Sequence, residues 1–283
     1  MRNGFKIWIM LAGACLCAPY SANGQWLNHP TPGTPRTRDG KPNLTALAPR
    51  ASNGKLDLSG VWHVEPPPPG EIERLFGAAL NDFVVPGDDP RVFSKYFLNI
   101  LADFKPDEVP MRPEAAALFG KRAQALGKDG PTSYCLPLGS PRVFLIPVPY
   151  KIIQTPGLVA MLFEADNTHR QVYTDGRKPL VDPQPTWLGY STGKWEGDTL
   201  VVETSGFNDR IWLDAFGHPQ SEASHVTERF HRRDFGHMEM QVTIDDPKSY
   251  TKPFTIKFNQ ILVPDSDILE SVCAENEKDR KHL

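Results

Sequence analysis

The chain has 283 residues, and its 31 Lys plus Arg against 34 Asp plus Glu give a formal net charge of −3. A weakly acidic balance offers no basic surface for nucleic acid or for an anionic membrane, so neither is expected as a partner. After residue 24 no apolar run approaches the length of about 18 residues that spans a bilayer, so no integral membrane segment is expected in the mature chain.

Residues 1–24 have the pattern of a secretory signal peptide. Arg2 and Lys6 form a cationic start, residues 7–17 are apolar, and the segment ends in Ala22-Asn23-Gly24, a small-x-small cleavage site. Cleavage after Gly24 predicts a periplasmic or secreted protein whose mature chain carries 29 basic and 34 acidic side chains, a net charge of −5. The alternative is a lipoprotein acylated at Cys15.

The next segment, residues 25–54, is rich in proline and poor in large apolar residues, and is predicted to be an extended arm. Within it, "DGKPNLTA" (39–46) is echoed by "NGKLDLSG" (53–60). A single domain, residues 55–283, is expected to follow.

This domain opens with "LDLSGVWHV" (56–64), whose alternation predicts a strand. Residues 70–130 then change to a helical period and predict an insertion. Asp89-Pro90 has the form of a helix start before an aromatic stripe that runs to Phe104, and Pro113 opens a second helix to about Leu126.

Two cysteines remain in the predicted mature chain, Cys135 and Cys273. An exported chain folds under oxidising conditions, and the pair lacks the Cys-x-x-Cys spacing of redox-active thiols, so a structural disulfide is expected.

From Cys135 onward the pattern is one of short strands joined by tight polar turns, which predicts an antiparallel meander of nine or ten strands. Such a meander closes most economically into a barrel or a strongly curled sheet. The expected strands after the first are 150–155, 158–165, 169–175, 187–195, 199–206, 225–233, 237–245, 253–263 and 268–273.

Alternation assigns faces to two of these strands. In 237–245 the apolar set alternates with a polar set that includes His237 and Glu239, and a barrel that holds a polar ligand could turn either set inward. His237 and Glu239 are therefore candidate ligand-binding residues. In "TERFHRRD" (227–234) the charged side chains are expected to form a solvated face with cross-strand pairs.

"GHPQSEASH" (217–225) places His218, Glu222 and His225 within eight positions. On a helix the three would share one face and could bind a metal, but on a strand Glu222 and His225 point to opposite faces. The following residues favour a strand, so no metal site and no cofactor are expected.

Just before it, the loop "GFNDRIWLD" (206–214) holds Asn208, Asp209, Arg210, Trp212 and Asp214. A histidine oriented by a carboxylate is a minimal set for acid/base chemistry, which makes His218, Asp209 and Glu222 the candidate catalytic residues. Arg210 and Trp212 are candidate ligand-binding residues. The alternative is that these polar groups build a turn and satisfy neighbouring backbone groups.

Arg142, in "GSPR" shortly after Cys135, is a further candidate. It is predicted either to be a buried receptor for an anionic group or to pair with Glu270 or Glu275 near Cys273.

The Gly60-x-Trp62 of the first strand resembles the opening motif of lipocalins, and this resemblance implies a barrel with a ligand cavity. A longer run is similar to a family of exported bacterial proteins of uncharacterised function, a resemblance that implies no activity. Its segments include "CLPLGSPR" (135–142), "PTWLGYSTGKWEGDTLVVETSGFNDRIWLD" (185–214) and "VTERFHRRDFGHMEMQVTIDDP" (226–247).

Three functions are compatible with this pattern. The first is binding of a small, partly apolar molecule in a lipocalin-like cavity in the periplasm. The second is a cofactor-independent hydrolase, isomerase or lyase that works through His218. The third is an envelope structural or interaction protein that uses the proline-rich arm. The sequence leaves open whether the protein is an enzyme.

Overall fold

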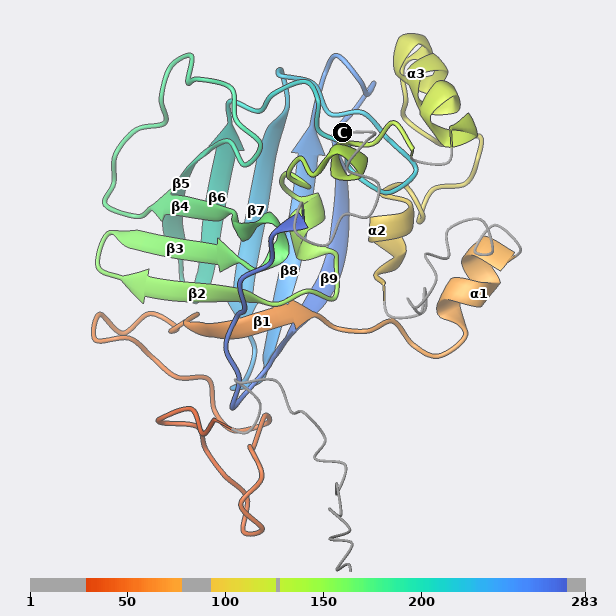
Figure 1. Ribbon diagram of the computed structural model, residues 1–283. Helices are drawn as coiled ribbons and strands as arrows, with labels where there is room; N and C mark the ends of the chain where they lie inside the picture. The colour runs from red at the N-terminus through yellow and green to blue at the C-terminus, as the bar shows by residue number, and fades with distance from the viewer. Residues whose placement is uncertain (1–28, 78–92, 126–127, 274–283) are drawn as a thin grey trace, which may run out of the picture.

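Nine strands close into a barrel in the computed structural model, which describes residues 29–77, 93–125 and 128–273 (Figure 1). The predicted mainly β barrel with a helical insertion after its first strand is therefore confirmed. In chain order the strands are β1 (Gly60–Val64), β2 (Tyr150–Thr155), β3 (Leu158–Phe163), β4 (His169–Tyr173), β5 (Tyr190–Glu196), β6 (Thr199–Ser205), β7 (His225–Arg232), β8 (His237–Asp245) and β9 (Phe254–Leu262).

Strand order around the barrel follows the sequence, and β9 closes on β1. A ring with an odd number of strands cannot alternate direction throughout, so one neighbouring pair has to run parallel. That pair is β4 and β5, which are in register only at Val172 with Ser191 and at Tyr173 with Thr192. Every other neighbouring pair is antiparallel. The connection 174–189 therefore has to return along the barrel before β5 begins.

The insertion contains α1 (Glu71–Phe76), α2 (Lys95–Leu98) and α3 (Pro113–Gln124). The helix expected from Pro90 to Phe104 is shorter than predicted, and its first residues lie outside the described part. It ends early because the N–H of Ile100 donates to the Asp214 carboxylate at 2.7 Å and the N–H of Leu101 donates to Asn99. These bonds replace the next helical bonds to backbone carbonyls. Among the described residues, no helix combines the length and apolar character needed to cross a membrane.

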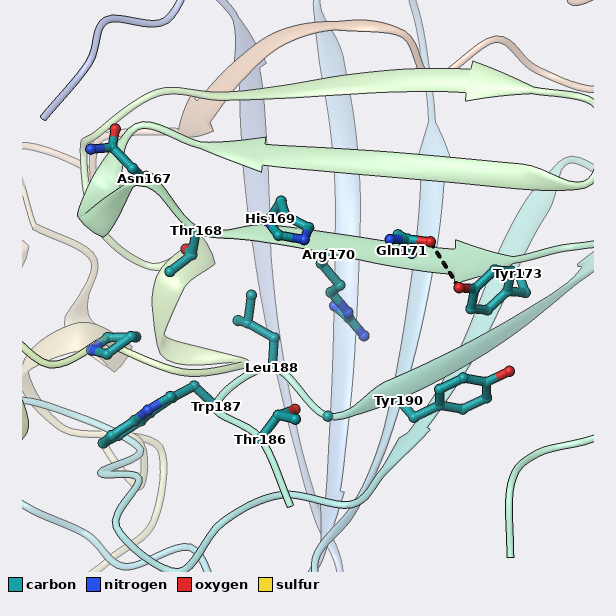
Figure 2. A pocket seen from close by; sticks show the side chains of 12 residues that line it. Asn167, Thr168, His169, Arg170, Gln171, Tyr173, Thr186, Trp187, Leu188 and Tyr190 are labelled. Atoms are coloured by element: carbon teal, nitrogen blue, oxygen red, sulfur yellow. Dashed lines mark hydrogen bonds between the residues drawn. The ribbon is translucent and has the colours of Figure 1, made fainter. Parts of the chain in front are cut away.

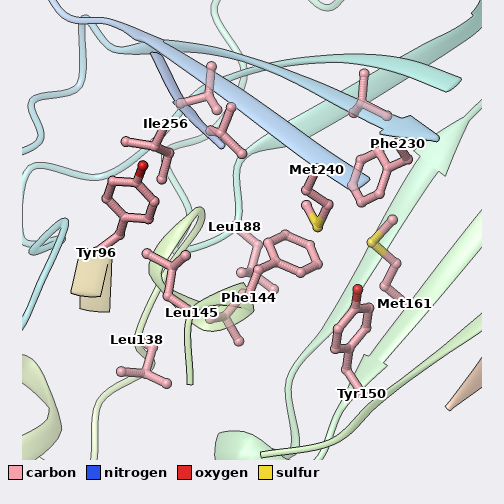
Figure 3. Packing of buried hydrophobic residues seen from close by; sticks show 14 of the residues in the cluster. Tyr96, Leu138, Phe144, Leu145, Tyr150, Met161, Leu188, Phe230, Met240 and Ile256 are labelled. Carbon is pink, nitrogen blue, oxygen red and sulfur yellow. The ribbon is translucent and has the colours of Figure 1, made fainter. Parts of the chain in front are cut away.

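The barrel lumen is filled by apolar side chains. The 3₁₀ turn η4 (Arg142–Phe144) carries Phe144 into it, and the ring centroids of Tyr150, Phe163 and Phe230 lie 5.2, 5.3 and 6.0 Å from that of Phe144 (Figure 3). The Nε2 of Gln260 donates to the Phe144 carbonyl at 2.8 Å and holds this turn in place. The chain's own aromatic residues thus occupy the space where a lipocalin-like cavity was expected.

The inward face of β8 is the apolar one, with Met238, Met240, Val242 and Ile244 all buried. On β7 the same parity turns Glu228 and Arg232 inward beside Val226 and Phe230, so the prediction that its charges form a solvated face is wrong for these two. Glu228 and Arg232 occupy alternate positions in step with the apolar residues of the strand, and this alternation predicts an inward direction. A charged side chain can be buried there when it has a buried partner.

Arg232 closes one end of the barrel over Trp62. Its guanidinium lies 4.9 Å from the Trp62 ring and donates to the carbonyls of Asp57, Ser59, Asp234 and Phe235. Burial lowers the pKa of Arg232 to about 10. The residues of the arm pack at this end, which we call the arm end, and α2 and α3 lie at the opposite, helix end (Figure 1).

The described part of the arm is folded as two matching turns, where an extended chain was predicted. The N–H of Thr37 donates to the Lys41 carbonyl, and fourteen residues later the N–H of Ala51 donates to the Lys55 carbonyl, both at 2.9 Å. The arginine before each turn makes two bonds to one barrel carboxylate: Arg36 binds Asp265, and Arg50 binds Asp198. The repeated sequence therefore corresponds to a repeated structure, a turn whose preceding arginine binds a carboxylate of the barrel.

Cys135 and Cys273 form the predicted disulfide, with their Cα atoms 5.6 Å apart. The strand expected at 268–273 is not formed. Polar side chains hold this segment instead, because the Glu164 carboxylate accepts from the N–H of Leu269 and Asn167 accepts from the N–H of Ser271.

Candidate functional site

A hollow of about 520 Å³ lies between the helix-end half of β4 and the segment 186–190, where the barrel wall has no strand ladder (Figure 2). We call it the seam pocket. Because the register of β4 with β5 begins only at Val172, the edge of His169, Arg170 and Gln171 that faces away from β3 borders the pocket and not a paired strand. The other residues used below that line it are Tyr173, Trp187, Leu188, Gly189 and Tyr190.

The wall opposite β4 is the end of the long return connection. It is fixed to the start of the 206–214 loop, since the N–H of Thr186 donates to the Gly206 carbonyl at 2.9 Å and the N–H of Asn208 donates to the Thr186 carbonyl at 3.0 Å. Gly189 has φ +65°, and a Cβ there would lie 2.6 Å from Thr204 Cγ2 and 2.8 Å from the Ser205 carbonyl oxygen. Only glycine allows this close approach without strain, and it sets the positions of Leu188 and Tyr190.

Aromatic rings line one side of the seam pocket. Tyr173 and Tyr190 stack with centroids 5.5 Å apart, and the Tyr173 hydroxyl donates to Gln171 at 2.8 Å (Figure 2). The Arg177 guanidinium covers the Tyr173 ring at 3.7 Å and is held by Asp175. Flat, half-buried rings beside a few polar groups form the kind of surface that binds partly apolar small molecules.

One residue of the lining, Arg170, belongs to a buried ion pair inside the barrel. Arg170 projects from β4 toward the 186–190 side (Figure 2), and its Nη1 and Nη2 donate to the two Glu228 oxygens at 2.9 and 2.5 Å. Arg170 also donates to Ser191 at 2.9 Å and to Thr204 at 2.6 Å. Both charges are thus compensated, and the network fixes β4, β5, β6 and β7 to one another below the pocket.

A second hollow, of about 590 Å³, lies on the other side of Trp187, which lines both. We call it the cationic pocket. The guanidinium of Arg210 lies 5.1 Å from the Trp187 ring, and that of Arg122, in the last turn of α3, lies 4.8 Å from the Trp212 ring. Lys121, Asp129, Asp209 and the exposed apolar side chains Leu118 and Tyr134 also line it.

Three residues singled out in the sequence meet in the cationic pocket: Asp209, Arg210 and Trp212. Asp209 and Arg210 are exposed, and Trp212 is buried with one side toward the hollow. The Asn208 side chain accepts from the N–H of Arg210 at 3.0 Å, so the turn expected from Asn208-Asp209 is formed as well.

His218 lies apart from this pocket's lining and is only 3% exposed. Its Nδ1–H donates to Asp214 at 2.5 Å, and the ring of Phe119 stacks on its imidazole at 4.0 Å. The carboxylate that orients His218 is therefore Asp214, whereas Asp209 or Glu222 had been predicted.

Asp214 also accepts from three backbone groups: the N–H of Ile100 at 2.7 Å, of Gly217 at 2.8 Å and of His218 at 3.1 Å. Burial opposes its ionisation, but the charge and hydrogen bonds of His218 together with the backbone N–H groups outweigh burial and hold the pKa of Asp214 below its usual range. The pair thus joins the segment after α2 to the 214–218 turn.

Glu222 is exposed and pairs with Lys248, and the first residue of β7, His225, pairs with Glu203 at 3.3 Å. His218, Glu222 and His225 therefore do not converge. Among the described residues, no group of three or more His, Cys, Asp or Glu side chains is placed to hold a metal ion.

Arg142 is buried, and its guanidinium lies 5.0 Å from the Phe97 ring. It forms no ion pair with a carboxylate in the described ranges: Glu270 is exposed, and Glu275 lies outside the described residues. Its Nε has no hydrogen-bond acceptor, and burial lowers its pKa to about 10. Its role as an anion receptor stays a prediction.

His237 and Glu239 lie on the outward face at the arm-end half of β8, away from both pockets. His237 binds Asp234 at 2.6 Å, and Glu239 is exposed 3.8 Å from Arg233. The polar face of this strand therefore points out of the barrel.

Sequence reasoning missed the aromatic residues of the seam pocket and two cationic residues of the cationic pocket: Tyr173, Trp187, Tyr190, Lys121 and Arg122. Trp187 and Tyr190 were placed in one strand, "WLGYSTGKW", whose glycine was the available signal that the chain turns before β5 begins. Lys121 and Arg122 looked like ordinary basic residues of a helix C-terminus.

Comparisons of the chain with protein-family models, with curated proteins and with solved structures find no match.

Proposed function

We propose that the protein binds a small, partly apolar molecule in the seam pocket, as an exported binding protein. The observation that carries this proposal is the break in the barrel wall at β4 and β5, where the described residues form a hollow lined by Tyr173, Trp187, Leu188 and Tyr190. Its volume of about 520 Å³ falls in the range of small-molecule sites.

Three features favour this location over the barrel lumen. Phe144 and its neighbours fill the lumen at the helix end. The glycine-dependent approach of Gly189 to β6 and the backbone bonds of Thr186 hold the pocket wall in place before any ligand arrives. A preformed wall lowers the entropic cost of binding.

Titration with the uncharged fluorophore N-phenyl-1-naphthylamine tests the proposal. Trp187→Leu and Tyr190→Ala should each weaken binding at least tenfold, because each removes a ring from the pocket. Trp195→Leu is the matched control, since Trp195 lies on β5, as Tyr190 does, but outside the lining. Thermal unfolding of all three variants checks that the fold is kept.

Two results would contradict the proposal. If the probe does not bind, or if Trp187→Leu and Tyr190→Ala bind it as tightly as Trp195→Leu does, the seam pocket is not the binding site. Non-denaturing mass spectrometry of the exported protein would then show whether it carries any co-purifying molecule at all.

A further inference from the structure

We infer that the ligand of the seam pocket carries an anionic group, a carboxylate, sulfonate or phosphate, which is bound in the adjoining cationic pocket. This inference rests on the proposed function, because it extends that ligand across Trp187. The shared ring of Trp187 makes the two hollows neighbours: one offers aromatic surface and the other offers positive charge.

The charge of the cationic pocket is not neutralised by its own side chains. The lining contains three cationic side chains, Lys121, Arg122 and Arg210, and two acidic ones, Asp129 and Asp209. In the described ranges none of the three cations lies within ion-pairing distance of a carboxylate. The pocket therefore has a net positive charge and three donors free of a carboxylate partner.

Arg122 and Arg210 are placed to bind one oxyanion between aromatic surfaces. Each guanidinium is set against a tryptophan ring, at 4.8 and 5.1 Å, and both tryptophans line the same hollow. Stacking on a ring restricts a guanidinium and leaves its N–H edges available for bidentate bonds to an oxyanion.

Arg122 has a second reason to take an anion. It is half-buried, its Nη1 donates to the Gly217 carbonyl at 3.1 Å, and burial lowers its pKa although the charge of Asp214 opposes this shift. Withdrawal of a charge from water is costly when no ion pair compensates it, and a bound oxyanion would add to the partial compensation that the charge of Asp214 provides. The position of Lys121 and Arg122 in the last turn of α3 also suits the helix dipole, but that role does not require Arg210 to face them.

A pair of probes that share an apolar body separates this inference from the proposed function. We would compare 8-anilinonaphthalene-1-sulfonate with uncharged N-phenyl-1-naphthylamine at low ionic strength. The expected result is that the sulfonate binds at least tenfold more tightly, that Arg210→Gln and Arg122→Gln each remove most of this preference, and that uncharged binding changes less than twofold.

Arg233→Gln is the matched control, because Arg233 is an exposed arginine at the arm end. If the two probes bind equally, or if the preference survives in both Arg210→Gln and Arg122→Gln, the anionic-group inference is wrong while binding in the seam pocket stands. If Trp187→Leu changes the binding of neither probe, the proposed function is wrong, and the anionic-group inference, which rests on it, is wrong as well.

Discussion

Among single residues, Asp214 joins two separate segments at the helix end, the segment after α2 and the 214–218 turn. It is fully buried and accepts four hydrogen bonds, from Ile100, Gly217 and twice from His218. An ionised carboxylate in that position is stable only while these donors remain. His218 therefore stabilises the fold by binding the buried carboxylate of Asp214.

We predict that His218→Ala lowers the free energy of unfolding by about 2–4 kcal/mol, because it removes a charge-assisted bond to a buried carboxylate and leaves a hole beside Phe119. Urea denaturation at pH 7 measures the loss. His225→Ala is the control, since His225 is half-exposed, and should change stability by less than about 0.5 kcal/mol.

The same pair predicts how stability depends on pH. The folded-state pKa of Asp214 lies below that of an unfolded aspartate, so its contribution is complete above the unfolded value near 4 and is lost as the pH falls through the folded value. The wild type should lose stability below about pH 4 more steeply than His218→Ala does. Equal slopes would mean that Asp214 does not carry this contribution.

Single residues also show where sequence reasoning stopped. The parity of "TERFHRR" placed Glu228 beside Val226 and Phe230, but the partner that makes its burial possible, Arg170, lies 58 positions away on β4. Likewise Asp214 belonged to the loop singled out beside His218, yet only the fold shows that it, and not Asp209 or Glu222, meets the histidine. Long-range pairing of charges leaves no local pattern in one sequence.

At the scale of elements, the regular strands were predictable and the interruptions were not. β2 and β8 begin and end at the predicted residues because hydrophobic alternation and flanking turn residues define them locally. α2 ends early, and the 187–195 run begins as a loop, because a distant carboxylate and a close backbone approach override local preference. The candidate site is built from such interruptions, which explains why the sequence located only its cationic part.

The return connection 174–189 gives a prediction at this scale. Gly189→Ala should destabilise the protein by about 1–3 kcal/mol, since a Cβ at φ +65° would meet the Ser205 carbonyl at 2.8 Å. It should also abolish binding of the uncharged probe, because Leu188 and Tyr190 would move. Gly197→Ala also has a positive φ but open space around it, so it should destabilise the fold and leave probe binding intact. Unfolding and titration of both variants make the comparison.

On the scale of the whole molecule, the barrel wall has one line along which strand pairing is short, between β4 and β5. Eight of its nine strand pairs are antiparallel ladders, and the ninth, β4 with β5, has a two-residue register. Below that line the Arg170–Glu228 network ties the four strands from β4 to β7 together from inside. The described arm and the disulfide fasten other parts of the surface, at Asp198, Asp265 and Cys135.

Hydrogen exchange should reveal this line directly. Amides of residues 169–173 and 190–192 are expected to exchange faster than those of β8, which has full ladders on both sides. Addition of a seam-pocket ligand should slow exchange in these two segments and leave β8 unchanged. Uniform protection around the ring, with or without ligand, would contradict a weak seam.

The odd number of strands has a consequence for how such a protein could change its ligand. A tenth strand beside β4 would restore alternation, whereas any chain that keeps nine strands keeps one parallel pair, and in this barrel that pair has a register of only two residues. The existence of the hollow thus follows from the short register of β4 with β5, and its chemistry is a property of a few rings such as Tyr173, Trp187 and Tyr190. Substitutions at those positions could therefore retune specificity without rebuilding the barrel, because the buried pair beneath them and the glycine behind them hold the opening in shape.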